Sequence, residues 1–297
     1  MAKVEANRAL MEGFLAQLLG FSVLDLQQRE KALSLPLQSE VRFKRYLGQI
    51  DAKVWAGAFL ARQAAERVVR SLDIEEPYTA HPLTAAEVRS AILRTDPYVN
   101  LDSLLRFCWD RGVVVFRMVS FPNSAKRFDG MALYVRERPM IALGSKRDAA
   151  PWLAFHLAHE LGHHILGHVK PGTPPVIDGS LEGGDHRSEQ EIEADRFACE
   201  VLTGEADPRF NPHPLRADGL ARYAQQEGYR RGIAPGVFAL IYGRSNDRWG
   251  VAQKALRRLG LESGGTRKIA QALDAHLDRE RLTEADARLL RVLDEAA

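Results

Sequence analysis

The chain has 297 residues, of which 45% are hydrophobic and 27% charged, and its formal net charge of +2 predicts no general affinity for polyanions. This length suffices for one well-packed core and a smaller helical module. The N-terminus lacks a signal peptide's basic start and apolar core, and no apolar run approaches the ~18 residues of a membrane span. The only cysteines, Cys108 and Cys199, lie in apolar helical contexts, so we expect a cytoplasmic protein without disulfides.

The first expected domain, residues 1–76, is helical. A short helix is predicted at residues 9–19 and a long one from about residue 40, where apolar residues follow in helical spacing. The region could bind a partner or dimerise, but we favour a helical brace packed on the rest of the chain. Pro77 and Pro82 then break any helix and mark a linker.

The second expected domain, residues 77–206, mixes helices with a small sheet. Thr84 and Glu87 are spaced as a capping box that opens one helix, and residues 101–110 form another. Three short strands are predicted, near residues 113–119, 130–135 and 139–143. The fold class is therefore α+β and mainly helical, and an edge strand of the sheet could hold an extended peptide.

The next predicted helix carries His-Glu-Leu-Gly-His at residues 159–163. His159 and His163 are four residues apart and share one helix face, so both imidazoles can reach one metal ion. Glu160 could act as general base on a metal-bound water. The pattern is typical of zinc peptidases. The alternative is a buried helix whose histidines are satisfied by hydrogen bonds.

A zinc hydrolase usually needs a third protein ligand and leaves one position open for water. His168 lies about 140° around a continued helix from His163 and is a poor candidate. His164 points less well still. His156 shares a face with His159, but packing or lining the cleft suits it better. The third ligand is therefore expected further along the chain.

A second helix is predicted at residues 188–202, with Glu191 and Asp195 one turn apart on one face. We expect Glu191 to be the third ligand and Asp195 to hold a ligand histidine by its other ring nitrogen. Two alternatives stay open. Ser188 and Glu191 are spaced as a capping box, which would explain Glu191 without metal, and Glu193 is a competing ligand about 200° away around the helix.

The segment between these helices, residues 169–184, is rich in glycine and proline. It is predicted to be either a mobile loop beside the site, such as a lid, or a disordered connector. His186 follows it and could stabilise an oxyanion, although zinc enzymes often take that donor from elsewhere.

Residues 156–166 and 191–202 together resemble the two motifs of the ImmA/IrrE family of metallopeptidases. The resemblance covers about residues 84–245. Asp195 stands where the family often has Asn, which suits a hydrogen-bond acceptor behind a ligand. The resemblance implies a bacterial or phage zinc protease that cuts a helix-turn-helix transcriptional repressor and so switches on a stress or mobile-element programme.

The third expected domain, residues 207–297, is a helical module. Residues 220–239 have a pattern typical of a helix-turn-helix. Residues 215–268 hold 11 Lys and Arg against 4 Asp and Glu, a local charge of 11 − 4 = +7. DNA or an acidic partner could bind there, but we favour solvated helix faces around a small core, because turn-helix patterns are common. Two short amphipathic helices are predicted over residues 267–297.

Two functions compete. The first is a zinc endopeptidase in which His159, His163 and Glu191 bind zinc and Glu160 is the catalytic base, acting on a specific protein. The second is a regulatory protein- or DNA-binding protein with a vestigial or structural metal site. Glu160 favours the first, because a structural site has no need of a general base.

Overall fold

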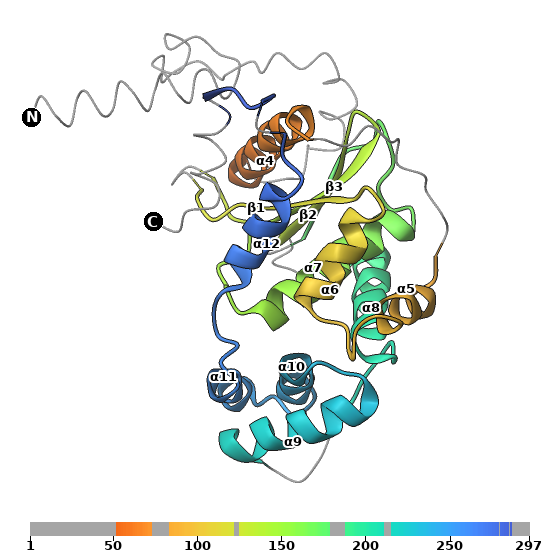
Figure 1. The fold of residues 1–297 in the computed structure, drawn as a ribbon, viewed down its shortest axis with the longest axis vertical. Helices are drawn as coiled ribbons and strands as arrows, with labels where there is room; N and C mark the ends of the chain where they lie inside the picture. Colours follow the sequence, from red (N-terminus) through yellow and green to blue (C-terminus); the bar gives the residue numbers. More distant parts are fainter. Residues whose placement is uncertain are drawn as a thin grey trace, which may run out of the picture.

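The computed structural model describes residues 52–72, 83–121, 125–178, 188–210, 215–278, 280–284 and 286 (Figure 1). The helices of this part are α4 (Ala52–Arg70), α5 (Ala85–Leu93), α6 (Leu101–Trp109), α7 (Ala150–Ile165), α8 (Glu189–Thr203), α9 (Ala217–Arg231), α10 (Pro235–Ser245), α11 (Trp249–Arg258) and α12 (Gly265–Asp274). The strands are β1 (Val114–Arg117), β2 (Gly130–Val135), β3 (Arg138–Leu143) and β4 (Val176–Asp178). The predicted α+β fold class, mainly helical with a small sheet, is confirmed.

The strands form one mixed sheet in the order β1-β3-β2-β4. β1 pairs parallel with β3, whereas β2 runs antiparallel to both β3 and β4. Val135 pairs with Arg138, so the β2–β3 hairpin turns over Arg136 and Glu137, both with the positive φ of a tight hairpin turn. The three predicted strands are confirmed, each within a few residues of its expected bounds.

β4 corrects the prediction of a loop throughout residues 169–184. Residues 176–178 pair with the free edge of β2, and the pairing joins Gly130 to Asp178. A three-residue strand has little periodicity of its own, and it forms here because β2 offers unpaired backbone groups. Residues 179–187, including His186, lie outside the described residues.

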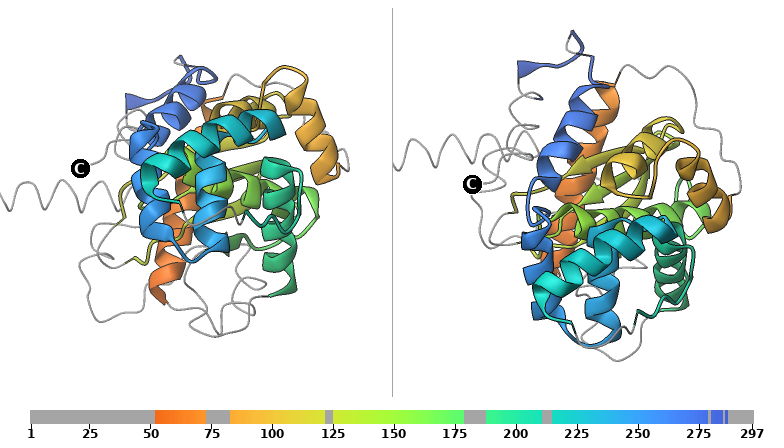
Figure 2. Two further views of the ribbon diagram at one scale, coloured as in Figure 1. Left: turned by 90° about the horizontal axis from the view of Figure 1, so that it is seen from below. Right: turned by 60° about the horizontal axis from the view of Figure 1, so that its bottom comes forward.

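Helices from distant parts of the chain cover the sheet. β1, β2 and β3 are buried almost throughout, α4 and α7 both pack on β2 and β3, and α12 packs on β1. α4 and α12 approach each other at one end of the molecule (Figure 2), where Leu72 bridges Leu277. The described part of the long N-terminal helix therefore packs as a brace, and residues 1–51 lie outside the described residues.

The helices α9, α10 and α11 gather below α7 in Figure 1 and share a small apolar cluster of their own. α10 is its centre: residues 236–243 are all buried, and α10 contacts α7, α9 and α11. A recognition helix needs an exposed face to enter a DNA groove. In α10, residues 236–243 are buried and Arg244 is exposed, so this helix packs on α7, α9 and α11 over most of its length. No helix in the described part of the chain combines the length and apolar character of a membrane span.

Arg89 of α5 ties two helix ends together. Its guanidinium donates to the carbonyls of Val201 and Leu202 at the end of α8, and to those of Arg231 and Gly232 at the end of α9. The last carbonyls of a helix lack partners within the helix and carry its negative dipole end. The buried Arg89 side chain therefore supplies donors to carbonyls at both helix ends and fixes α9 relative to α8.

Replacing Arg89 with Met should lower the free energy of unfolding by about 2–4 kcal/mol, because buried carbonyls lose their donors. Urea unfolding followed by circular dichroism measures this. Arg94→Met, at an exposed position just past the end of α5, is the matched control and should change stability little. Equal stability of Arg89→Met and the native chain would contradict this role.

Candidate metal centre

The candidate site lies where α7 and α8 pack side by side (Figure 1). α7 begins at Ala150 and has Pro151 in its first turn, where proline is favourable. The two helices approach closely at Gly162, where an added Cβ would lie only 3.0 Å from the ring of Phe197. The same packing of α7 and α8 leaves Glu191, in the first turn of α8, next to His159 and His163.

His159, His163 and Glu191 converge there. The Nε2 atoms of the two histidines are 3.1 Å apart, and Glu191 places Oε2 3.2 Å from the first and Oε1 3.5 Å from the second. Tetrahedral zinc with bonds of about 2.0–2.1 Å needs about 3.3 Å between any two ligand atoms. The three donor atoms thus fit one zinc ion. Ser188 also accepts from the Glu191 backbone N–H, so the cap and the metal group coexist.

Asp195 lies behind His159, where the sequence predicted an acceptor. Its Oδ1 is 3.1 Å from His159 Nδ1, which leaves Nε2 facing Glu191. Burial opposes a charge on His159, but the hydrogen bonds with Asp195 and Glu191 outweigh it and raise the pKa of His159 to about 11. In the metal-free chain His159 is therefore a cation bound between two carboxylates.

His163 shows the opposite behaviour. Burial, followed by the charge of neighbouring His159, lowers the pKa of His163 to about 3. A neutral imidazole keeps one nitrogen lone pair, which is the form that binds metal. In the metal-free chain the ring of His159 is thus charged and that of His163 is neutral.

Glu160 is fully buried, and neither oxygen of its carboxyl group has a hydrogen-bond partner among the described residues. Burial raises the pKa of Glu160 well above its usual value, and the negative charges of Asp178 and Glu191 add to the effect. Gly130 of β2 makes the room: an added Cβ would lie 2.1 Å from Glu160 Oε1. A buried carboxyl group without a protein partner fits a group that exchanges protons with a ligand.

Asp178 is a site residue that the sequence did not predict. β4 carries it to the side of Glu160, where ligand atoms of His159, Glu160 and Asp178 lie within 4.8 Å of one another. Its Oδ2 is 3.7 Å from Nδ1 of His156, the histidine expected to line the cleft. The position of Asp178 depends on the long-range pairing of β4 with β2, which leaves no local sequence signal.

The remaining candidate ligands lie outside the group of three. His164 turns away and hydrogen-bonds the Met140 carbonyl through Nε2. His168 and Glu193 contact each other, with His168 Nε2 2.9 Å from Glu193 Oε2. His168 Nδ1 also lies 2.9 Å from His163 Nδ1, on the side of that ring opposite the metal-facing nitrogen.

The comparisons with known proteins agree with this geometry. Residues 108–223 match the sequence model of one protein family, the IrrE N-terminal-like domain, which is a peptidase domain. The matched segment contains every residue of the candidate site. No curated protein matches the chain.

We expect zinc binding at pH 7 to release at least about one proton per ion, because His159 is protonated in the metal-free chain and must be neutral to bind. Calorimetric titration of metal-free protein in buffers of different ionisation enthalpy measures the release. The observed heat should vary linearly with that enthalpy. A heat that is the same in every buffer would contradict the charged state of His159.

Proposed function

We infer that the chain is a zinc-dependent endopeptidase, from the premise that its residues 108–223 belong to the ImmA/IrrE metallopeptidase family. One observation carries the proposal: buried Glu160, which has no hydrogen-bond partner among the described residues, lies beside three converging ligand atoms. A structural zinc site uses all its coordination positions and has no need of such a carboxyl group. Three ligands with an adjacent base are the arrangement of hydrolytic sites.

In this proposal His159, His163 and Glu191 hold the zinc ion. When bound, zinc supplies Lewis acidity that activates a water molecule and polarises the scissile carbonyl. Glu160 takes the proton of the attacking water and delivers it to the leaving amine nitrogen. The raised pKa of Glu160 lets it keep the proton between these two steps.

The substrate that we propose is a specific protein, namely a helix-turn-helix transcriptional repressor cut in a stress or mobile-element response. The family resemblance supports this substrate class. β4 is the terminal strand of the sheet, and Asp178 at its end lies beside Glu160. An extended substrate segment that adds to this edge would therefore run past the catalytic carboxyl group.

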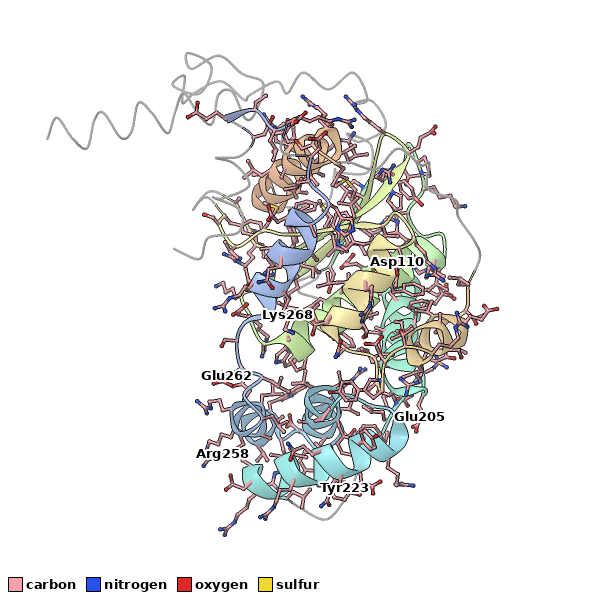
Figure 3. The ribbon with its side chains drawn as sticks, in the orientation of Figure 1. Asp110, Glu205, Tyr223, Arg258, Glu262 and Lys268 are labelled. Atoms are coloured by element: carbon pink, nitrogen blue, oxygen red, sulfur yellow. The ribbon has the colours of Figure 1, made fainter. Side chains whose placement is uncertain are left out.

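The competing function, DNA binding through residues 215–268, gains less support. Several of its cations are already paired at the surface, among them Arg258 with Asp218 and Arg231 with Glu205. Figure 3 labels one residue of each pair, Arg258 and Glu205. α10 is also buried over most of its length. Binding of DNA by this segment stays a prediction of the sequence.

Replacing Glu160 with Gln should leave zinc bound but lower cleavage by about 10²–10⁴-fold, because the amide cannot accept the proton of water. Mass spectrometry of a digested peptide library measures cleavage, and elemental analysis measures zinc. Glu189→Gln, exposed in the first turn of α8, is the control. Normal turnover by Glu160→Gln would refute the mechanism.

Replacing Gly130 with Ala should impair cleavage by at least about tenfold while the zinc ligands stay intact, because the new methyl group displaces Glu160 from its position. The same two assays apply. Gly250→Ala is the matched control, since an added Cβ there has no atom within 4 Å. Full activity of Gly130→Ala would show that catalysis does not depend on the position of Glu160.

A further inference from the structure

His163, His168 and Glu193 form a hydrogen-bonded series that the sequence did not predict. His163 Nδ1 lies 2.9 Å from His168 Nδ1, and His168 Nε2 lies 2.9 Å from Glu193 Oε2. We propose that His168 and Glu193 act as positioning residues, which hold His163 in the tautomer that presents Nε2 to zinc. The inference rests on the proposed zinc site.

The hydrogen atoms of this hydrogen-bonded series can be assigned from the Glu193 end. The Glu193 carboxylate only accepts, so His168 Nε2 carries the hydrogen of that contact. With the ring hydrogen of His168 on Nε2, its Nδ1 lone pair accepts from Nδ1–H of His163. The Nε2 lone pair of His163 is left facing His159 Nε2 and Glu191. Reversing the hydrogen bonds would put a hydrogen on His163 Nε2 and block the metal.

The end of α7 explains how His168 reaches this place. Gly167 has a left-handed φ of 76°, the His168 N–H donates to the His163 carbonyl at 2.9 Å, and the Gly167 N–H donates to the His164 carbonyl at 3.3 Å. This is the Schellman pattern of helix ends. It folds the chain back, so that the side chain of His168 lies against His163 instead of about 140° around a continued helix.

α8 thereby supports both proposed histidine ligands. Asp195 contacts His159 directly, whereas the ring of His168 spans the space between Glu193 and His163. Glu191 and Glu193 project from different sides of α8, one to the metal-facing nitrogen of His163 and one to the partner of its other nitrogen. Partners of this kind typically contribute 10–100-fold to metal affinity.

The two residues should not contribute equally. The side chain of His168 is 6% exposed and that of Glu193 is 51% exposed. Water can replace the Glu193 carboxylate as acceptor more readily than it can replace the buried ring. A change at His168 should therefore weaken zinc binding more than a change at Glu193.

The test is a zinc titration of the purified, metal-stripped full chain in competition with a chromophoric chelator. His168→Phe keeps a ring but removes both nitrogens and should raise the zinc Kd by about 10–100-fold. Glu193→Ala should raise it by a smaller factor. Glu189→Ala, also exposed on α8, is the matched control and should leave the Kd unchanged. Thermal unfolding of the metal-free variants separates a loss of affinity from a loss of fold.

Each outcome decides a separate question. If the wild type binds zinc and folded His168→Phe binds it equally well, the positioning role is overturned while the zinc site stands. If His168→Phe does not fold, the exposed variant Glu193→Ala still tests the proposal, and an unchanged Kd there overturns it. If the wild type itself binds no zinc, the proposed function fails instead.

Discussion

The close packing of α8 on α7 is the constraint on which the site depends. Two imidazoles on α7 can share an ion with a carboxylate on α8 only if the donor atoms come within about 3.3 Å of each other. Gly162 has no side chain, whereas a larger residue there would push Phe197, and with it α8, away from α7. Arg89 then fixes the far end of α8 to the end of α9. The geometry of the candidate site thus depends on residues that are not themselves candidate ligands.

Burial of charge distinguishes this centre from an ordinary packed helix pair. Glu160 is fully buried and has no hydrogen-bond partner in the described part of the chain, which costs stability, and a core selected only for packing would avoid such a group. His159, by contrast, gains two carboxylate partners and keeps its charge in the metal-free chain. The candidate site therefore combines the proposed base, whose pKa is raised by burial, with two histidines that contact residues of α8 or a partner of such a residue.

Local patterns made part of this site predictable from sequence. Helical spacing placed His159 and His163 on one face of a helix, and the one-turn spacing of Glu191 and Asp195 on a second helix predicted a third ligand and an acceptor for a ligand histidine. Asp178 was not predictable, because β4 exists only by pairing with a strand more than forty residues away. His168 lies elsewhere than predicted, because α7 ends at Ile165 and does not continue to His168. Gly167, with its positive φ, is itself a sequence signal for that end. The burial of α10 depends on its packing against α7, α9 and α11, which the spacing of apolar residues along the sequence does not reveal.

The most direct test of this account is the zinc content of the purified protein, measured by elemental analysis for the native chain and for Glu191→Ala. The account predicts about one zinc per chain in the native protein and a large loss in the variant, because three ligands converge on one position. No zinc in the native protein after incubation with excess metal would contradict it. So would full retention by Glu191→Ala, which would remove Glu191 from the site.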